Sequence, residues 1–156
     1  MNVQIIAVGN KMPAWVVEGT NEYLRRFPWE FSVSFCEVSP HKRGKTVDLN
    51  KVKEAEGDKC IAAIAKGNRV IALEVLGKPW DTSKLATQIN NWKMDGRNIS
   101  LLIGGPEGLS EKCAEVADQH WSLSPLTLPH PLVRVIVTEA LYRAWSLTQN
   151  HPYHRE

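Results

Sequence analysis

Short apolar runs typical of buried strands alternate with amphipathic helical patterns along the 156-residue chain, and this alternation constrains the fold more than any other feature. Strands that are apolar on both faces are typical of a parallel sheet that helices cover on each side. The sequence therefore predicts an α/β fold with a mostly parallel sheet of five or six strands and helices on both faces. The expected strands are residues 3–8, 31–35, 70–75, 99–103 and 121–123.

The stretches between these runs carry apolar residues at helical spacing and begin with residues that favour helix starts. The last helix carries Val135, Ile136 and Leu147 beside its main apolar stripe, and two buried faces on a terminal helix indicate a homodimer. The buried face of the first helix is expected to hold Trp15, Val16, Tyr23, Leu24 and Phe27. The expected starts or caps are Pro13, Thr46 or Asp48, Asp81 or Thr82, Ser110 and Pro131.

Length and composition indicate an ordinary globular protein with one domain over residues 1–156. The net charge of +2 is too small to indicate a nucleic-acid partner by itself. The first residues lack the pattern of a signal peptide, and no stretch approaches the roughly 20 apolar residues of a membrane span. We therefore expect a cytoplasmic protein that does not bind a membrane.

Several classes of site are disfavoured because their motifs are absent from the sequence. Cys36, Cys60 and Cys113 are scattered and form no C-x-x-C pair, which indicates reduced core thiols and no zinc site or disulfide framework. The chain has no P-loop, no G-x-G-x-x-G after a strand, no H-E-x-x-H and no G-x-S-x-G. These absences argue against NTPases, dinucleotide oxidoreductases, metalloenzymes and serine hydrolases, and we expect no metal.

Two loops that follow neighbouring strands are the best candidates for a binding pocket. Gly104-Gly105-Pro106 ends one strand, and a loop rich in proline and leucine at 124–131 follows the next. Ligands of α/β sheets usually bind outside the carboxyl ends of the strands, where these loops would meet. Each loop taken alone is also consistent with a plain connection.

The C-terminal tail and one basic loop each allow a functional and a structural interpretation. His151, Tyr153, His154 and Arg155 follow the last helix and can hydrogen-bond to or stack on a base, or they form a disordered end. The segment HKRGK at 41–45 is a solvated charged loop or a surface that contacts phosphates. His130 is either a site residue or only the cap of the last helix.

These segments also carry a resemblance. The chain resembles the RlmH family, the bacterial large-subunit ribosomal RNA pseudouridine N3-methyltransferases of the SPOUT superfamily, over essentially its whole length. The resemblance rests on AVGNKMP, EYLRRFP, KRGK, LLIGGPEGLS, LTLPHPLVRV, LYRAWS and NHPYHRE. It implies a C-terminal trefoil knot, a homodimer, S-adenosylmethionine (SAM) as methyl donor and a pseudouridine of 23S rRNA in assembled ribosomes as acceptor.

Carried over position by position, the resemblance also implies a donor site. We expect leucine side chains to sandwich the adenine, loop main chain to bind its polar edge, and the missing side chain of Gly104 to leave room for the ribose or methionine part. The implied residues are Leu73, Gly104, Leu123, Ser124, Pro125, Leu126, Thr127 and Leu128.

The reaction chiefly needs alignment of acceptor, methyl group and leaving sulfur, because the methyl group of a sulfonium is already activated. As hypotheses, His154, Tyr153 and Arg155 hold the acceptor base, Arg143 compensates charge on it, and His130 is a weaker candidate. Other functions remain open: a non-catalytic ribosome-assembly factor of the same fold, a methyltransferase that acts on tRNA or a ribose hydroxyl, or a small-molecule nucleotide binder.

Overall fold

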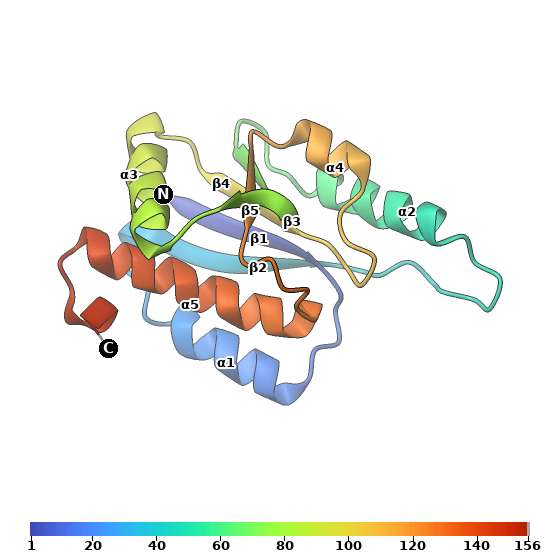
Figure 1. Cartoon of the computed structure of the whole chain (residues 1–156), viewed down its shortest axis with the longest axis horizontal. Helices are drawn as coiled ribbons and strands as arrows, with labels where there is room; N and C mark the ends of the chain where they lie inside the picture. The colour runs from blue at the N-terminus through green and yellow to red at the C-terminus, as the bar shows by residue number, and fades with distance from the viewer. Residues whose placement is uncertain (156) are drawn as a thin grey trace.

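A five-stranded, all-parallel sheet forms the centre of the protein in the computed structural model, which describes residues 1–155 (Figure 1). The strand order is β2-β1-β4-β3-β5, so the first strand of the chain is an inner strand. The strands are β1 (Asn2–Val8), β2 (Ser32–Val38), β3 (Arg69–Pro79), β4 (Ile99–Ile103) and β5 (Gln119–Ser122). The prediction of an α/β fold with a parallel sheet is confirmed.

Helices cover both faces of the sheet, as predicted. On one face lie α1 (Ala14–Leu24), α3 (Thr82–Asp95) and α5 (His130–Thr148), and on the other lie α2 (Leu49–Ala62) and α4 (Glu111–Val116) (Figure 1). Side chains alternate along β1, so that Val3 and Ile5 belong to the core under α3 and α5 whereas Ile6 and Val8 belong to the core under α2 and α4. Short 3-10 turns occupy Trp29–Phe31 and Pro152–Arg155.

Side-chain caps fix three of the helix starts. Asp48 accepts a hydrogen bond from the Asn50 N–H at 2.9 Å, and Asp81 accepts one from the Lys84 N–H at 2.8 Å. Asp48 and Asp81 are therefore the caps among the alternatives that the sequence left open. Ser110 caps α4 as expected. Helix α5 begins one residue earlier than predicted, after Pro129.

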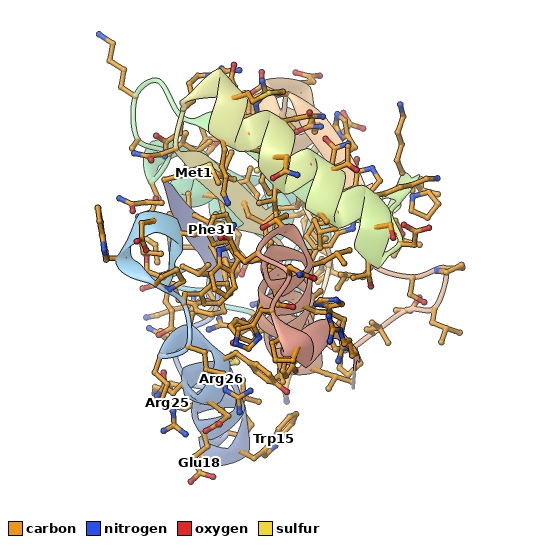
Figure 2. The ribbon with its side chains drawn as sticks, turned by 90° about the vertical axis from the view of Figure 1, so that its left-hand side faces the viewer. Met1, Trp15, Glu18, Arg25, Arg26 and Phe31 are labelled. Atoms are coloured by element: carbon orange, nitrogen blue, oxygen red, sulfur yellow. The ribbon has the colours of Figure 1, made fainter. Side chains whose placement is uncertain are left out.

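The prediction for the buried face of α1 is wrong at two positions. Trp15 is 53% exposed and projects from the far end of α1, because it lies about 100° around the helix from the buried Val16 (Figure 2). Phe27 follows the end of the helix and packs against Tyr142 and Phe31 instead. Phe31 itself lies in a 3-10 turn, so β2 begins at Ser32.

A buried arginine connects the last helix to the edge of the sheet. Arg134 is only 4% exposed, and it donates hydrogen bonds to the carbonyl oxygen of Gly9 at 2.8 Å and to Glu37 Oε2 at 2.6 Å. The start of α5 is therefore held against the carboxyl ends of β1 and β2. A buried guanidinium needs such partners, since an unpaired buried charge costs several kcal/mol.

Three further expectations concern the cysteines, membrane spans and the path of the chain. Cys36, Cys60 and Cys113 are free thiols, and Cys60 and Cys113 are buried in the core under α2 and α4, as predicted. None of the helices in residues 1–155 is both long and apolar enough to cross a membrane. The trefoil knot stays a prediction of the family resemblance.

Candidate functional site

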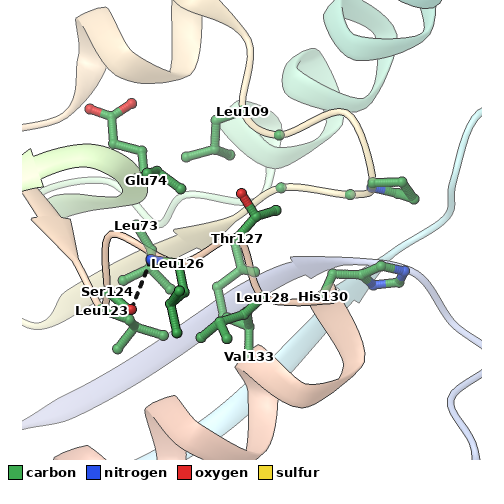
Figure 3. Close-up of a pocket in the computed structure, with 16 residues that line it drawn as sticks. Leu73, Glu74, Leu109, Leu123, Ser124, Leu126, Thr127, Leu128, His130 and Val133 are labelled. Carbon is green, nitrogen blue, oxygen red and sulfur yellow. Dashed lines mark hydrogen bonds between the residues drawn. The ribbon is translucent and has the colours of Figure 1, made fainter.

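A pocket opens where the carboxyl ends of β3, β4 and β5 meet the start of α5 (Figure 3). It is lined by residues 73–75 of β3, residue 103 at the end of β4, residues 104–106, 108 and 109 after it, residues 123, 124 and 126–128 after β5, and His130 and Val133 of α5. The two loops singled out in the sequence therefore form one pocket. Of the eight residues expected to bind the donor, seven line it: Leu73, Gly104, Leu123, Ser124, Leu126, Thr127 and Leu128. The eighth, Pro125, is exposed and lies outside the lining.

A tight turn after β4 forms one wall of the pocket. The Gly108 N–H donates a hydrogen bond to the Gly105 carbonyl oxygen at 2.9 Å, and Gly108 adopts a φ of +83°, which favours glycine. A Cβ added at Gly104 would lie 2.4 Å from the carbonyl carbon of Gly108. The missing side chain of Gly104 therefore allows the turn to close on itself. That it also leaves room for the ribose or methionine part of the donor stays a prediction.

The loop after β5 forms the opposite wall and is shaped by two serines. Ser122 Oγ donates to the Ser124 carbonyl oxygen at 3.2 Å, and Ser124 Oγ accepts from the Leu126 N–H at 3.0 Å (Figure 3). Within residues 1–155, the N–H groups of Thr127 and Leu128 donate no hydrogen bond. Leu126 is 70% exposed at the rim. The loop thus offers main-chain donors and apolar side chains together.

A bulge in β3 forms a third wall that the sequence did not reveal. Both Leu73 and Lys78 pair with Trp121 of β5, so residues 74–77 are looped out between them. Gly77 makes this return possible, since a Cβ there would lie 2.8 Å from the main chain of Trp121. The bulge turns Val75 toward the pocket and leaves Leu76 96% exposed.

Glu74 and His120 form a polar pair at the edge of the pocket. Glu74 Oε1 lies 2.5 Å from His120 Nδ1, and Figure 3 shows the Glu74 side chain on the side of Leu109, away from Leu128 and Val133. Glu74 is the only carboxylate among the pocket-lining residues of the described chain. Neither residue was a candidate from the sequence, because a single acidic residue at a strand end gives no motif.

His130 is the first residue of α5 and lines the pocket without capping the helix. Burial lowers the pKa of its imidazole, and the guanidinium groups of Arg134 and Arg43 lower it further. His130 is therefore neutral at pH 7. Its ring points away from the leucines of the pocket in Figure 3.

The C-terminal tail folds back onto the far end of α5. Tyr153 Oη donates a hydrogen bond to Glu139 Oε1 at 3.0 Å, and Arg143 Nε donates to the same oxygen at 2.8 Å. The Tyr153 ring also lies 4.8 Å from the ring of Tyr142, and the Arg26 guanidinium lies 5.7 Å from its centroid. The tail is thus ordered by packing, which contradicts the alternative of a disordered end.

The electrostatics of the tail keep its tyrosine protonated. Burial raises the pKa of Tyr153 well above its usual value, and hydrogen bonds with Tyr23 and Glu139 raise it further. His154 is half-buried, and its Nδ1 is buried with no hydrogen-bond partner among the described residues. Arg155 is exposed. The Tyr153 hydroxyl thus already donates to Glu139, the unpaired Nδ1 of His154 is enclosed, and Arg155 extends an exposed guanidinium.

The tail and the pocket do not meet within one chain. His130 lies at the first residue of α5, and the tail follows its last residue, Thr148. Because an α-helix rises about 1.5 Å per residue, these two ends are about 27 Å apart. Figure 1 likewise shows the C-terminus at the opposite end of α5 from the pocket loops. His154, Tyr153, Arg155 and Arg143 are thus gathered at one end, and the predicted donor residues and His130 at the other.

The acidic and basic side chains around the pocket are few and partly paired with one another. Residues 1–155 contain no cluster of three His, Cys, Asp or Glu side chains placed to hold a metal ion. The acidic side chain nearest the glycine turn, Glu107, is instead paired with Arg43. The pocket can therefore bind through apolar contact and main-chain hydrogen bonds.

The comparisons with known proteins agree with this geometry. A family model described as "Predicted SPOUT methyltransferase" matches residues 1–154. The chain belongs to the SPOUT methyltransferase family. Because the match spans almost the whole chain, the fold, the pocket and the tail all lie inside the family region.

Solved structures of the same fold include three bacterial proteins described as methylases or methyltransferases. The chain is 11% identical to one from Haemophilus influenzae Rd KW20, with a TM-score of 0.58 over 97% of this chain and 69% of that one. It is 12% identical to a protein from Neisseria gonorrhoeae, with a TM-score of 0.53 over 90% of this chain and 81% of that one. A third, from Legionella pneumophila, was solved with bound SAM and is 11% identical, with a TM-score of 0.51 over 92% and 66%. At these identities the likeness concerns the fold.

Proposed function

We propose that this SPOUT-family chain binds SAM in the pocket and transfers its methyl group to N3 of a pseudouridine in 23S rRNA. The observation that carries the proposal is the pocket itself, in which leucine side chains and unpaired main-chain donors converge at the carboxyl ends of parallel strands. The family membership and the SAM-bound relative of the same fold support the donor. The acceptor rests on the sequence resemblance.

The residues present fit a nucleoside that lacks phosphates. Leu73, Leu126 and Leu128 provide apolar surface suited to a planar base, and the N–H groups of Thr127 and Leu128 suit its polar edge. The wall at Gly104–Gly108 has no lysine and no helix N-terminus of useful length to attract a phosphate. SAM would supply an activated methyl group, so the protein would need mainly to align the acceptor with it.

The tail side chains suit the acceptor base better than the donor. Because Tyr153 stays protonated and its hydroxyl donates to Glu139, it would hold the tail in place and would not act as a general base. The Nδ1 of His154 is unpaired but buried, so it would have to become exposed before it could hydrogen-bond to the base. Arg155 and Arg143 would then balance negative charge on the two carbonyl oxygens beside N3. The proton on that nitrogen is acidic enough for a weak base or water to remove it.

A homodimer follows from the separation of these two groups. If both the pocket and the tail take part in one reaction, the tail must come from a second copy of the chain, since about 27 Å of helix separates them in one copy. A two-fold dimer would bring two tails to two pockets. Two exposed apolar residues of α1, Trp15 and Val17, offer surface for such an association.

The proposal is tested by transfer of a radiolabelled methyl group from SAM to intact ribosomes, separated subunits and tRNA. All three should come from cells that lack this protein, and the product should be mapped by nuclease digestion and mass spectrometry. We expect label on a pseudouridine of 23S rRNA, strongest with intact ribosomes. Label in tRNA would contradict the acceptor. Absence of both label and SAM binding would instead support a non-catalytic assembly factor.

A further inference from the structure

The loop between β2 and α2, residues 39–47, is attached to the pocket by a single arginine. Arg43 Nε donates to Glu107 Oε1 at 3.1 Å, and Arg43 Nη2 donates to Glu56 Oε2 at 3.1 Å. Glu107 stands between Pro106 and Gly108 in the turn that lines the pocket. Arg43 therefore joins three segments: loop 39–47, helix α2 and the glycine turn.

This attachment is fixed by a buried charge. Glu56 is only 2% exposed, and besides Arg43 it accepts a hydrogen bond from the His41 N–H at 3.0 Å. A buried carboxylate must stay paired, because removing its partner leaves an uncompensated charge at a cost of several kcal/mol. The loop is thus held at one position relative to the pocket, although most of its residues are exposed.

The other basic side chains of the loop have no partner among the residues that the structure describes. His41, Lys42 and Lys45 are exposed, and their side chains make no hydrogen bond or ion pair with residues 1–155. Each lies within two residues of Arg43, so their Cα atoms are within about 7 Å of it. Arg43 itself is neutralised by two carboxylates, which leaves Lys42 and Lys45 as the free positive charges beside the pocket turn.

We propose that loop 39–47 contacts backbone phosphates of the RNA substrate through Lys42 and Lys45, and that Arg43 keeps this contact in register with the donor pocket. The inference rests on the proposed function in that the acceptor is RNA. Lysines act as point charges toward phosphates and carry no sequence preference. Because the net charge is only +2, attraction to RNA must come from such local groups. Because Arg43 holds this loop to the turn that lines the pocket, RNA whose base reaches the pocket would lie near Lys42 and Lys45. The loop offers no large apolar side chain as an anchor for a protein partner.

The test compares ribosome binding by the full-length protein, the double variant K42A/K45A, and a matched control, K66A/K84A. Lys66 and Lys84 are exposed and lie outside the pocket lining and loop 39–47, so the control removes the same charge elsewhere. We expect K42A/K45A to reduce the slope of log affinity against log salt by about 1.5 to 2. At low salt this corresponds to a roughly tenfold weaker affinity for ribosomes. The control should behave like the wild type, and the affinity of both variants for SAM should be unchanged.

A second variant tests the role assigned to Arg43. R43K keeps the charge but loses the fork that reaches Glu56 and Glu107 together. We expect R43K to weaken both SAM binding and ribosome binding, whereas K42A/K45A weakens only the latter. A structural defect alone would lower thermal stability without this difference between the two variants.

Three outcomes would separate the proposed phosphate contact of loop 39–47 from the proposed function. A wild-type salt slope in K42A/K45A would overturn the phosphate contact while leaving the methyl-transfer proposal intact. A slope change seen with protein-containing subunits but absent with protein-free 23S rRNA at low salt would assign the loop to a ribosomal protein and also overturn it. If the wild type binds ribosomes but methylates nothing, the proposed function fails, and the loop contact is still decided by the slope.

Discussion

The two ends of helix α5 differ in almost every physical respect. At its start, near His130, the surroundings are main chain, glycine and leucine, and they enclose a pocket. At its end, Tyr153, Arg143 and Glu139 form a compact network of rings and charges. One end is therefore suited to enclosing a small molecule, and the other presents side chains that can hydrogen-bond to a base.

If the proposed function is right, this contrast means that a single copy of the chain holds two incomplete half-sites. Binding of the donor would then require only the start of α5 and the two loops around it. Methyl transfer would require both ends, because the side chains suited to handle the acceptor base are about 27 Å from the pocket. The following predictions test whether the two ends act separately in binding and together in transfer.

Removal of residues 151–156 should have the largest effect. We expect methyl transfer to ribosomes to fall on the order of 100-fold or more, since the acceptor is no longer positioned, while the SAM dissociation constant stays nearly unchanged. Calorimetry measures the SAM affinity, and transfer of a radiolabelled methyl group measures the rate. Arg155→Ala removes an exposed side chain without disturbing the packing, and it should also slow methyl transfer, to a smaller degree, without changing the SAM affinity. Gln149→Ala, at another exposed position, is its control. A truncated protein that methylates at the normal rate would disprove a role for the tail.

Mixing two variants that are impaired at different ends of α5 should restore part of the activity at a SAM concentration too low for the Gly104→Ala pocket. A chain without residues 151–156 keeps its pocket, and a chain with Gly104→Ala keeps its tail. Random exchange makes about half of the dimers mixed, each with one intact pair of pocket and tail, so about a quarter of the wild-type rate should return. The rate is measured after unfolding and refolding the two chains together, with each chain refolded alone as control. No recovery, despite proven exchange, would mean that pocket and tail act within one chain.

Gly104→Ala should weaken donor binding more than ribosome binding. The added Cβ would lie 2.4 Å from the main chain of Gly108, so the turn must shift, at a cost of about 1 to 3 kcal/mol in the free energy of unfolding. We expect the SAM affinity to fall by at least about tenfold. Gly44→Ala is the matched control, because a Cβ there meets nothing within 4 Å. Equal SAM affinities for the two variants would show that the turn does not shape the pocket.

Substitution of His130 should have the smallest effect, which appears only in the pH dependence of the free energy of unfolding. Its folded pKa is lowered mainly by burial, so on acidification the unfolded chain takes up a proton first. The stability that neutral His130 provides is present above about pH 6.5 and declines as the pH falls from there toward the folded pKa. His130→Gln should flatten this decline in urea midpoints measured between pH 7.5 and 5.5. A wild-type pH dependence in the variant would assign the decline to other groups.

The order of elements in this fold was largely readable from local patterns in the sequence. Apolar runs such as 99–103 became a strand with the predicted bounds, and Ser110 caps its helix as expected. These features depend on neighbours within a few residues, which is why they can be predicted. Trp15 was misplaced because its hydrophobicity fits the stripe, while its exposure depends on what α1 packs against.

Features that depend on contacts far apart in the sequence were missed. The bulge at residues 74–77 exists because Lys78 returns to pair with Trp121, and nothing near residue 77 in the sequence indicates that partner. The clamp of Arg43 on Glu56 and Glu107 likewise spans 64 positions. The separation of tail and pocket was predictable, however, because the expected helix already lay between them and its length follows from its residue count.

The inner position of β1 has a consequence for how the chain is made. β1 is the first element to be synthesised, yet its neighbour β4 comes at residues 99–103, and Arg134, which holds the Gly9 carbonyl, comes later still. Pairings this distant in sequence form slowly, since the loop between them must close first. During synthesis, one edge of β1 therefore stays open until most of the chain has been made. The first strand to be made is thus among the last to be completed, and a chain that stops before residue 134 should not reach the native state.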